Sequence, residues 1–230
     1  MTERGMIFNG EMVRAILDGR KTQTRRVIQS AARTMQARGL EVISHRAPGD
    51  KLYGDYVFSM RDRNGVWHDF TNEQFLAKCP FGQPGDRIWV RETWAEAGAG
   101  EPDLKLYRAN YPAHVPTHYE NVPPAEDVRW TPSIHMPRWA SRILLEITDV
   151  RVERLNDISE EDARAEGIID GGCLNCGELE PCGCANPEPD ATDAFAYLWQ
   201  SIYGQENWNA NPWVWVIEFY RIEGDGHATD

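Results

Sequence analysis

The sequence lacks any long apolar run, and no stretch approaches the roughly 18 consecutive apolar residues that a membrane-spanning helix needs. It also lacks a signal-peptide pattern, because residues 1–5 lead directly into a short apolar run. Positive charge is scarce as well, since 24 Lys and Arg face 36 Asp and Glu for a formal net charge of -12. We therefore expect a cytoplasmic protein with no membrane partner. We also expect weak sequence-independent binding to duplex DNA, because such binding requires clustered Lys and Arg.

The scarce positive charge is concentrated near the N-terminus. Asp18 and Glu41 are the only acids between Arg14 and Arg46, whereas residues 153–193 are strongly acidic. A local basic patch for one anionic or polar ligand is therefore compatible with an acidic chain.

Apolar periodicity predicts a mixture of helices and strands in a chain that is 41% hydrophobic. Helices are expected over 11–17, 159–167 and 192–204, each with a glycine at or just beyond its end. Strands are expected over 6–8, 22–28, 53–60, 66–70, 87–91, 142–155 and 213–220. Asn64-Gly65 predicts a hairpin turn in which both residues take a positive φ. Without a βαβ rhythm or an internal repeat, this order predicts one α+β domain over residues 1–230, a small β-barrel decorated by helices.

Three segments do not fit this periodic pattern. Residues 29–50 are predicted to form an arm, an insertion or a partial helix. Residues 95–128, rich in Pro, Gly, Ala and acids, are predicted to form a long surface excursion. Residues 170–190 are a Cys-, Gly- and Pro-rich insertion.

Four thiols lie close together in that insertion, at Cys173, Cys176, Cys182 and Cys184. Two close pairs in a cytosolic chain favour tetrahedral thiolate ligation over disulfides. We expect a structural zinc ion, because four protein ligands leave no open position for catalysis. The alternatives are iron–sulfur ligation and a loop of reduced thiols without metal.

Residues 19–26, with the sequence Gly-Arg-Lys-Thr-Gln-Thr-Arg-Arg, are the best candidate site. By composition alone they fit a solvated basic edge strand equally well. They resemble the signature of the ASCH superfamily, Gly-x-Lys-x-x-Glu-x-Arg: Gly19, Lys21 and Arg26 match, and Thr24 stands where many members have Glu. Residues 84–94 are similar to those of phage and prophage ASCH proteins. The resemblance implies a PUA-like β-barrel linked to RNA and modified nucleosides, in the host cytoplasm if the chain is phage-encoded.

The threonine has an implication of its own. Gly-Arg-Lys-Thr-x-Thr-x-Arg is similar to the ASCH branch that hydrolyses the amide of N4-acetylcytidine, and residues 158–166 resemble the helical segment that carries the glutamate of that branch. These two likenesses make Lys21, Thr24 and Glu166 the catalytic candidates. Thr24 would supply a hydroxyl, Lys21 a base once burial or positive neighbours lower its pKa, and Glu166 a proton shuttle. In a regular strand Lys21 and Thr24 face opposite sides, so the chain must bend after Gly19 for them to meet.

Five further residues are candidate substrate-binding groups: Arg25, Arg26, Trp94, His135 and Trp139. The two arginines suit an oxyanion or a phosphate, and Trp139, in a loop with Pro and Arg, suits stacking on a base. The plainer interpretation is that a strand tryptophan such as Trp94 belongs to the core and that a lone histidine is structural.

Three functions remain open on these grounds. The first is an amidohydrolase acting on an N-acylated or otherwise modified pyrimidine nucleoside, and the Thr at the Glu position favours it. The second is a PUA-like module that binds single-stranded RNA or a modified nucleobase without chemistry. The third is a zinc-stabilised phage module that docks a protein partner. The overall acidity favours a nucleoside-sized ligand over a long nucleic acid.

Overall fold

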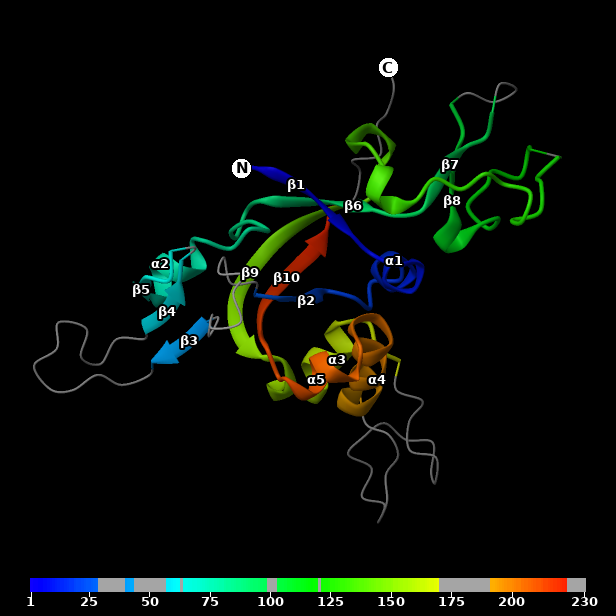
Figure 1. The fold of residues 1–230 in the computed structure, drawn as a ribbon. Helices are drawn as coiled ribbons and strands as arrows, with labels where there is room; N and C mark the ends of the chain where they lie inside the picture. The colour runs from blue at the N-terminus through cyan, green and yellow to red at the C-terminus, as the bar shows by residue number, and fades with distance from the viewer. Residues whose placement is uncertain are drawn as a thin grey trace, which may run out of the picture.

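Five strands form one strongly curved sheet in the order β1-β6-β9-β10-β2 (Figure 1). They are β1 (Glu3–Ile7), β2 (Gln23–Val27), β6 (Arg87–Arg91), β9 (Leu144–Arg154) and β10 (Trp213–Arg221). β1 runs parallel to β6, and the other neighbours are antiparallel. This computed structural model describes residues 1–28, 40–43, 57–62, 64–98, 103–119, 121–169 and 191–222. The α+β fold and these five strands confirm the sequence prediction.

β10 is an interior strand that is buried on both faces. Trp215, Ile217 and Phe219 belong to the main core, together with apolar residues of β1, β6 and β9. Val214 and Val216 point the other way, into a second core. Near-continuous apolar character is the pattern expected of a strand covered on both sides, and it is why this strand is the clearest in the sequence.

The two edge strands of this sheet, β1 and β2, approach each other without pairing. Arg26 of β2 donates from Nη2 to the carbonyl oxygen of Ile7 at 2.9 Å, and its guanidinium lies 5.3 Å from the ring centroid of Phe8. The described strands therefore form no closed barrel. The structure differs from the predicted barrel at this point, because the side chain of Arg26, and not a row of backbone hydrogen bonds, spans the gap between β1 and β2.

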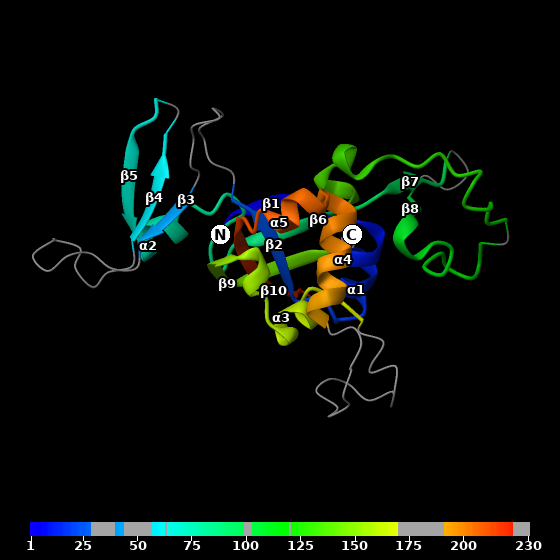
Figure 2. The same ribbon diagram turned by 60° about the horizontal axis from the view of Figure 1, so that its bottom comes forward.

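Four helices pack beside the main sheet (Figures 1 and 2): α1 (Gly10–Leu17), α3 (Glu160–Ala165), α4 (Ala191–Tyr203) and α5 (Gln205–Asn209). α1 contributes to the main core, and α3, α4 and α5 lie together at the second core. Asn9 caps α1 by accepting from the Met12 amide, and Ser159 caps α3 by accepting from the Asp162 amide. Gly19, with φ of +76°, turns the chain from α1 into β2, as its position after the helix predicts.

Two smaller sheets project from opposite ends of the main sheet (Figure 2). One contains β3 (Leu40–Ile43), β4 (Val57–Arg61) and β5 (Trp67–Thr71), followed by α2 (Asn72–Leu76). The other pairs β7 (Trp94–Glu96) with β8 (Lys105–Tyr107). β3 lies inside the 29–50 segment, where the sequence pattern predicted no strand, and β7 with β8 shows that the 95–128 excursion begins with an antiparallel pair of strands. Residues 29–39 and 44–50 lie outside the described residues.

The β4–β5 hairpin forms where Asn64-Gly65 predicts it, with a different turn. Gly65 has φ of +83°, whereas Asn64 is not among the residues with positive φ. The carboxylate of Asp62 accepts from the amides of Asn64 and Val66, at 2.8 and 2.9 Å. The Asp62 side chain thus adds two hydrogen bonds to the backbone bonds of this turn, and Gly65 takes the left-handed conformation.

None of the helices in the described part of the chain combines the length and the apolar character that crossing a bilayer would require.

Candidate functional site

The chain between α1 and β2 is held on both sides by backbone hydrogen bonds. On one side the amides of Arg20 and Lys21 donate to the carbonyl of Ala15 in α1, at 2.9 and 3.0 Å. On the other side Lys21 forms an isolated antiparallel bridge with Glu166, and the amide of Thr22 donates to the carbonyl of Ala165 at 2.8 Å. Lys21 is therefore fixed where the C-terminal ends of α1 and α3 meet.

Lys21 and Glu166 form a buried ion pair at this junction. Nζ of Lys21 lies 2.5 Å from Oε2 of Glu166 and also donates to the main-chain oxygen of Glu166 at 2.8 Å. The side chains are 0% and 4% exposed. Two of the three catalytic candidates, which lie 145 residues apart in the sequence, are therefore in direct contact.

Burial lowers the pKa of Lys21 below its ordinary value of 10.5. The carboxylate of Glu166 opposes this shift, and the nearby guanidinium groups of Arg26 and Arg25 add to it. Desolvation thus outweighs the ion pair, since removing an ammonium from water disfavours its charged form. The environment of Lys21 therefore favours release of a proton, as a base in catalysis requires.

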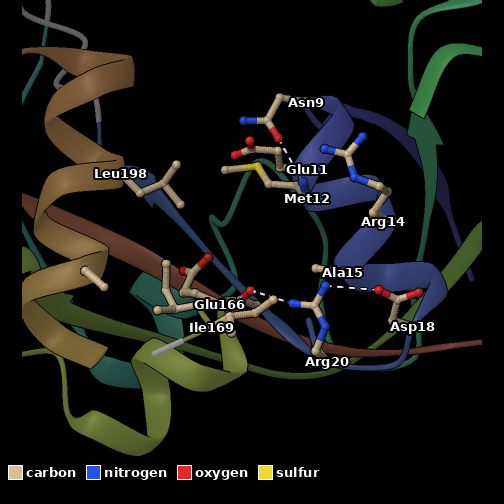
Figure 3. A pocket seen from close by; sticks show the side chains of 13 residues that line it. Asn9, Glu11, Met12, Arg14, Ala15, Asp18, Arg20, Glu166, Ile169 and Leu198 are labelled. Atoms are coloured by element: carbon tan, nitrogen blue, oxygen red, sulfur yellow. Dashed lines mark hydrogen bonds and ion pairs between the residues drawn. The ribbon is translucent and has the colours of Figure 1, made fainter. Parts of the chain in front are cut away.

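Glu166 also lines a cavity of about 560 Å³ between α1, α4 and the end of α3 (Figure 3). Met12 and Ala15 of α1 form one wall, and Leu198 of α4 contributes to another. Arg20 closes the lower edge by donating to the carbonyl of Gly167 at 2.9 Å. The cavity volume suits a small ligand.

Thr24, the third catalytic candidate, lies on β2 opposite Ile217 of β10. It is 1% exposed, and because directly paired residues share a face, its side chain points toward the main core that contains Ile217. No hydrogen bond joins Thr24 to Lys21 or Glu166. The structure therefore brings together the amine and the carboxyl, and it leaves the hydroxyl buried nearby on β2 without a bond to either.

Arg25, a predicted substrate-binding residue, is enclosed by acidic side chains instead. Its Nη2 lies 3.1 Å from Glu153 Oε2 and 3.1 Å from Asp162 Oδ2, and its Nη1 lies 3.6 Å from Glu166 Oε1. The guanidinium is 0% exposed, so it ties β2 to β9 and α3. Arg151 of β9 joins this network through Asp162 at 2.9 Å.

The sequence analysis missed Asp162 and Glu153 as members of this site. A signal for Asp162 was present, because residues four apart on a helix share a face and Asp162 precedes Glu166 by four. No local pattern connects Glu153 with Arg25, since the two residues are 128 positions apart and lie on the strands that flank β10.

The four remaining substrate-binding candidates, Arg26, Trp94, His135 and Trp139, do not line this cavity. Trp94 is buried in β7 and packs edge-on against Trp139, with ring centroids 5.3 Å apart. Trp139 is 51% exposed, and His135 is exposed in the short 3₁₀ helix Ser133–His135. Trp139 thus remains available to stack on a ligand, at a place separate from Glu166.

The four thiols of the zinc prediction, Cys173, Cys176, Cys182 and Cys184, lie outside the described residues. Within the described ranges, no three His, Cys, Asp or Glu side chains are arranged to hold a metal ion.

Comparisons with family models, with curated proteins and with solved structures find no match to this chain.

Proposed function

We propose that this chain is a PUA-like amidohydrolase that cleaves the exocyclic amide of an N-acylated pyrimidine nucleoside such as N4-acetylcytidine. The observation that supports the proposal most directly is the buried Lys21–Glu166 pair beside a cavity of about 560 Å³. A buried ion pair is a poor way to stabilise a fold, because the desolvation of two charges offsets their attraction. Its position at a cavity wall favours a role in proton transfer.

In the proposed reaction the hydroxyl of Thr24 attacks the acyl carbon and its proton passes to the amine of Lys21. Glu166 holds the resulting ammonium in place. Lys21 then returns the proton to the departing amino group as the C–N bond breaks, and water releases the acyl group from Thr24. Binding of the substrate has to turn the Thr24 hydroxyl from the main core toward Lys21, because Thr24 faces that core in this structure and has no hydrogen bond to Lys21.

The proposal predicts that the protein releases cytidine from N4-acetylcytidine, and chromatography of the reaction mixture measures that release. Lys21→Met and Thr24→Val should each lower kcat by about a hundredfold or more, since each removes a group that handles the transferred proton. Glu161→Gln is the control and should leave kcat unchanged. Glu161 is an exposed carboxylate on α3, the helix that ends at Glu166. Absence of turnover by the unmodified protein at high enzyme concentration would remove the proposal.

We also infer that the four clustered cysteines hold one structural zinc ion, from their spacing and thiolate chemistry. Metal analysis of the purified chain should find one zinc per molecule. Cys173→Ser/Cys176→Ser should abolish that zinc, whereas Cys79→Ser, at a buried cysteine outside the cluster, should retain it. Stoichiometric iron in place of zinc, or no metal at all, would contradict the inference.

A further inference from the structure

A second, smaller cavity of about 270 Å³ lies at the start of α1, next to the end of β6. It is lined by Gly10, Arg14, Glu92, Thr93, Arg108 and Ala109. The cavity is polar, and two of its six lining side chains are arginines. In a chain with a net charge of -12, this is an unusual concentration of positive charge around one small space.

The single acid of this cavity does not neutralise the two arginines. Glu92 is 1% exposed, and both of its carboxylate oxygens accept from Arg142, at 2.9 and 3.0 Å. Arg142 is held in turn by Asn110 Oδ1 at 2.8 Å and by the ring of Tyr107, 4.0 Å away. This bidentate pair satisfies Glu92, so the charges of Arg14 and Arg108 remain uncompensated.

Both arginines have donors to spare. Arg14 uses Nη1 to donate to the carbonyl of Ala109 at 2.8 Å, which fixes the side chain in place. Among the described residues, the other nitrogens of Arg14 and the whole guanidinium of Arg108 have no hydrogen-bond or ion-pair partner. The hydroxyl-bearing Thr93 lines the same space. Two guanidinium groups and a hydroxyl around one small cavity are the kind of donor set that a phosphate monoester takes.

Gly10 keeps this space open. A Cβ at position 10 would lie 3.7 Å from Nη1 of Arg14 and 3.8 Å from Cα of Ala109, at ordinary contact distance from both. Alanine is therefore tolerated by the backbone, and its methyl group would occupy the room beside the guanidinium of Arg14.

The geometry points to a phosphate-binding subsite formed by Arg14, Arg108 and Thr93. Arg14 also lines the larger cavity beside Glu166, so the two cavities share this residue as a wall. Resting on the proposed function, the substrate class is then a nucleoside 5′-monophosphate, with its base near Glu166 and its phosphate between the arginines. A phosphate carries a charge of about -1.5 to -2 at neutral pH, which two arginines balance. The strong net negative charge of the chain disfavours a longer polyanion.

A calorimetric titration of the full chain with inorganic phosphate tests the subsite alone. We expect saturable binding that weakens at least fivefold in Arg108→Gln and in Gly10→Ala. Arg129→Gln removes the same charge from an exposed arginine outside the cavity and should leave the affinity unchanged. No saturable binding to the unmodified chain, or an equal loss in Arg129→Gln, would overturn the subsite.

A second titration compares cytidine 5′-monophosphate with cytidine. The nucleotide should bind at least tenfold more tightly, and Arg108→Gln should remove that difference. Equal affinity for the two compounds overturns the assignment of a nucleotide substrate. Phosphate binding without turnover of an acylated nucleoside supports the subsite and counts against the proposed hydrolysis. Turnover without phosphate binding supports the hydrolysis and counts against the subsite.

Discussion

Replacing Glu166 by glutamine is expected to lower the free energy of unfolding by about 3–5 kcal/mol, measured by urea denaturation at pH 7. The two side chains are nearly isosteric, so packing changes little. The variant leaves the ammonium of Lys21 fully buried without its counter-ion, and an uncompensated buried charge is costly. The guanidinium of Arg25, which lies 3.6 Å from Oε1 of Glu166, adds like-charge repulsion.

The dependence of this loss on pH identifies its cause. Burial already holds the pKa of Lys21 in the folded state below its ordinary value of 10.5, and Glu166 is the group that raises it. Without Glu166 that pKa falls further. Between the folded and the unfolded pKa the unfolded chain binds more protons, so stability rises with pH. The deficit of Glu166→Gln relative to the unmodified protein should therefore shrink as the pH is raised toward 10.5.

Two further variants complete this experiment. Glu161→Gln, at an exposed position of α3, should change the stability by less than about 0.5 kcal/mol. Lys21→Met combined with Glu166→Gln should be less destabilised than the sum of the single variants, because the double variant buries no charge. A deficit that does not vary with pH, or additive single variants, would show that the ion pair is not what stabilises this junction.

Replacing Gly167 by alanine is expected to cost about 2–5 kcal/mol of folding free energy, as a sum of backbone strain and overpacking. Gly167 has φ of +91°, which a residue with a Cβ adopts at a cost. Its Cβ would also lie 2.8 Å from the Cβ of Ala15 and 3.1 Å from that of Lys21. Since Ala15 belongs to a helix, the end of α3 has to move away from α1, and Glu166 moves with it.

Gly19→Ala separates these two contributions. Gly19 also has a left-handed backbone, with φ of +76°, but nothing lies within 4 Å of a Cβ built on it. Its replacement should therefore cost only the backbone term, about 1–2 kcal/mol. Thermal denaturation of both variants gives the comparison. Equal losses would mean that contact between the ends of α1 and α3 contributes nothing to the effect.

Local signals made much of the fold predictable from the sequence. Asn9, Gly19 and Ser159 act over a few residues, so the ends of α1 and α3 follow from side chains that the sequence displays directly. The strand β10 is readable for the same reason, because burial on both faces requires apolar residues throughout. The parallel pairing of β1 with β6 was not predictable, since no local rule connects Glu3 with Arg87.

The candidate site divides in the same way. The resemblance singled out Lys21 in residues 19–26 and Glu166 at the end of residues 158–166, and the structure places the two side chains in contact. The basic character of the same segment suggested that Arg25 was free for a ligand. Its true partners, Glu153 and Asp162, come from β9 and α3, more than a hundred residues away. The charge of a sequence segment therefore does not show whether its arginines are paired with acidic side chains from other strands and helices.

The gap between β1 and β2 has a mechanical consequence. Every other neighbouring pair in the five-stranded sheet shares a row of backbone hydrogen bonds, whereas these two strands are joined through the side chain of Arg26 to Ile7. Both residues line a groove that shares Asn9 and Met12 with the cavity beside Glu166. The sheet is thus an open ring, and the gap between its edge strands lies next to that cavity. The gap can widen for a ligand without the loss of any backbone hydrogen bond between strands.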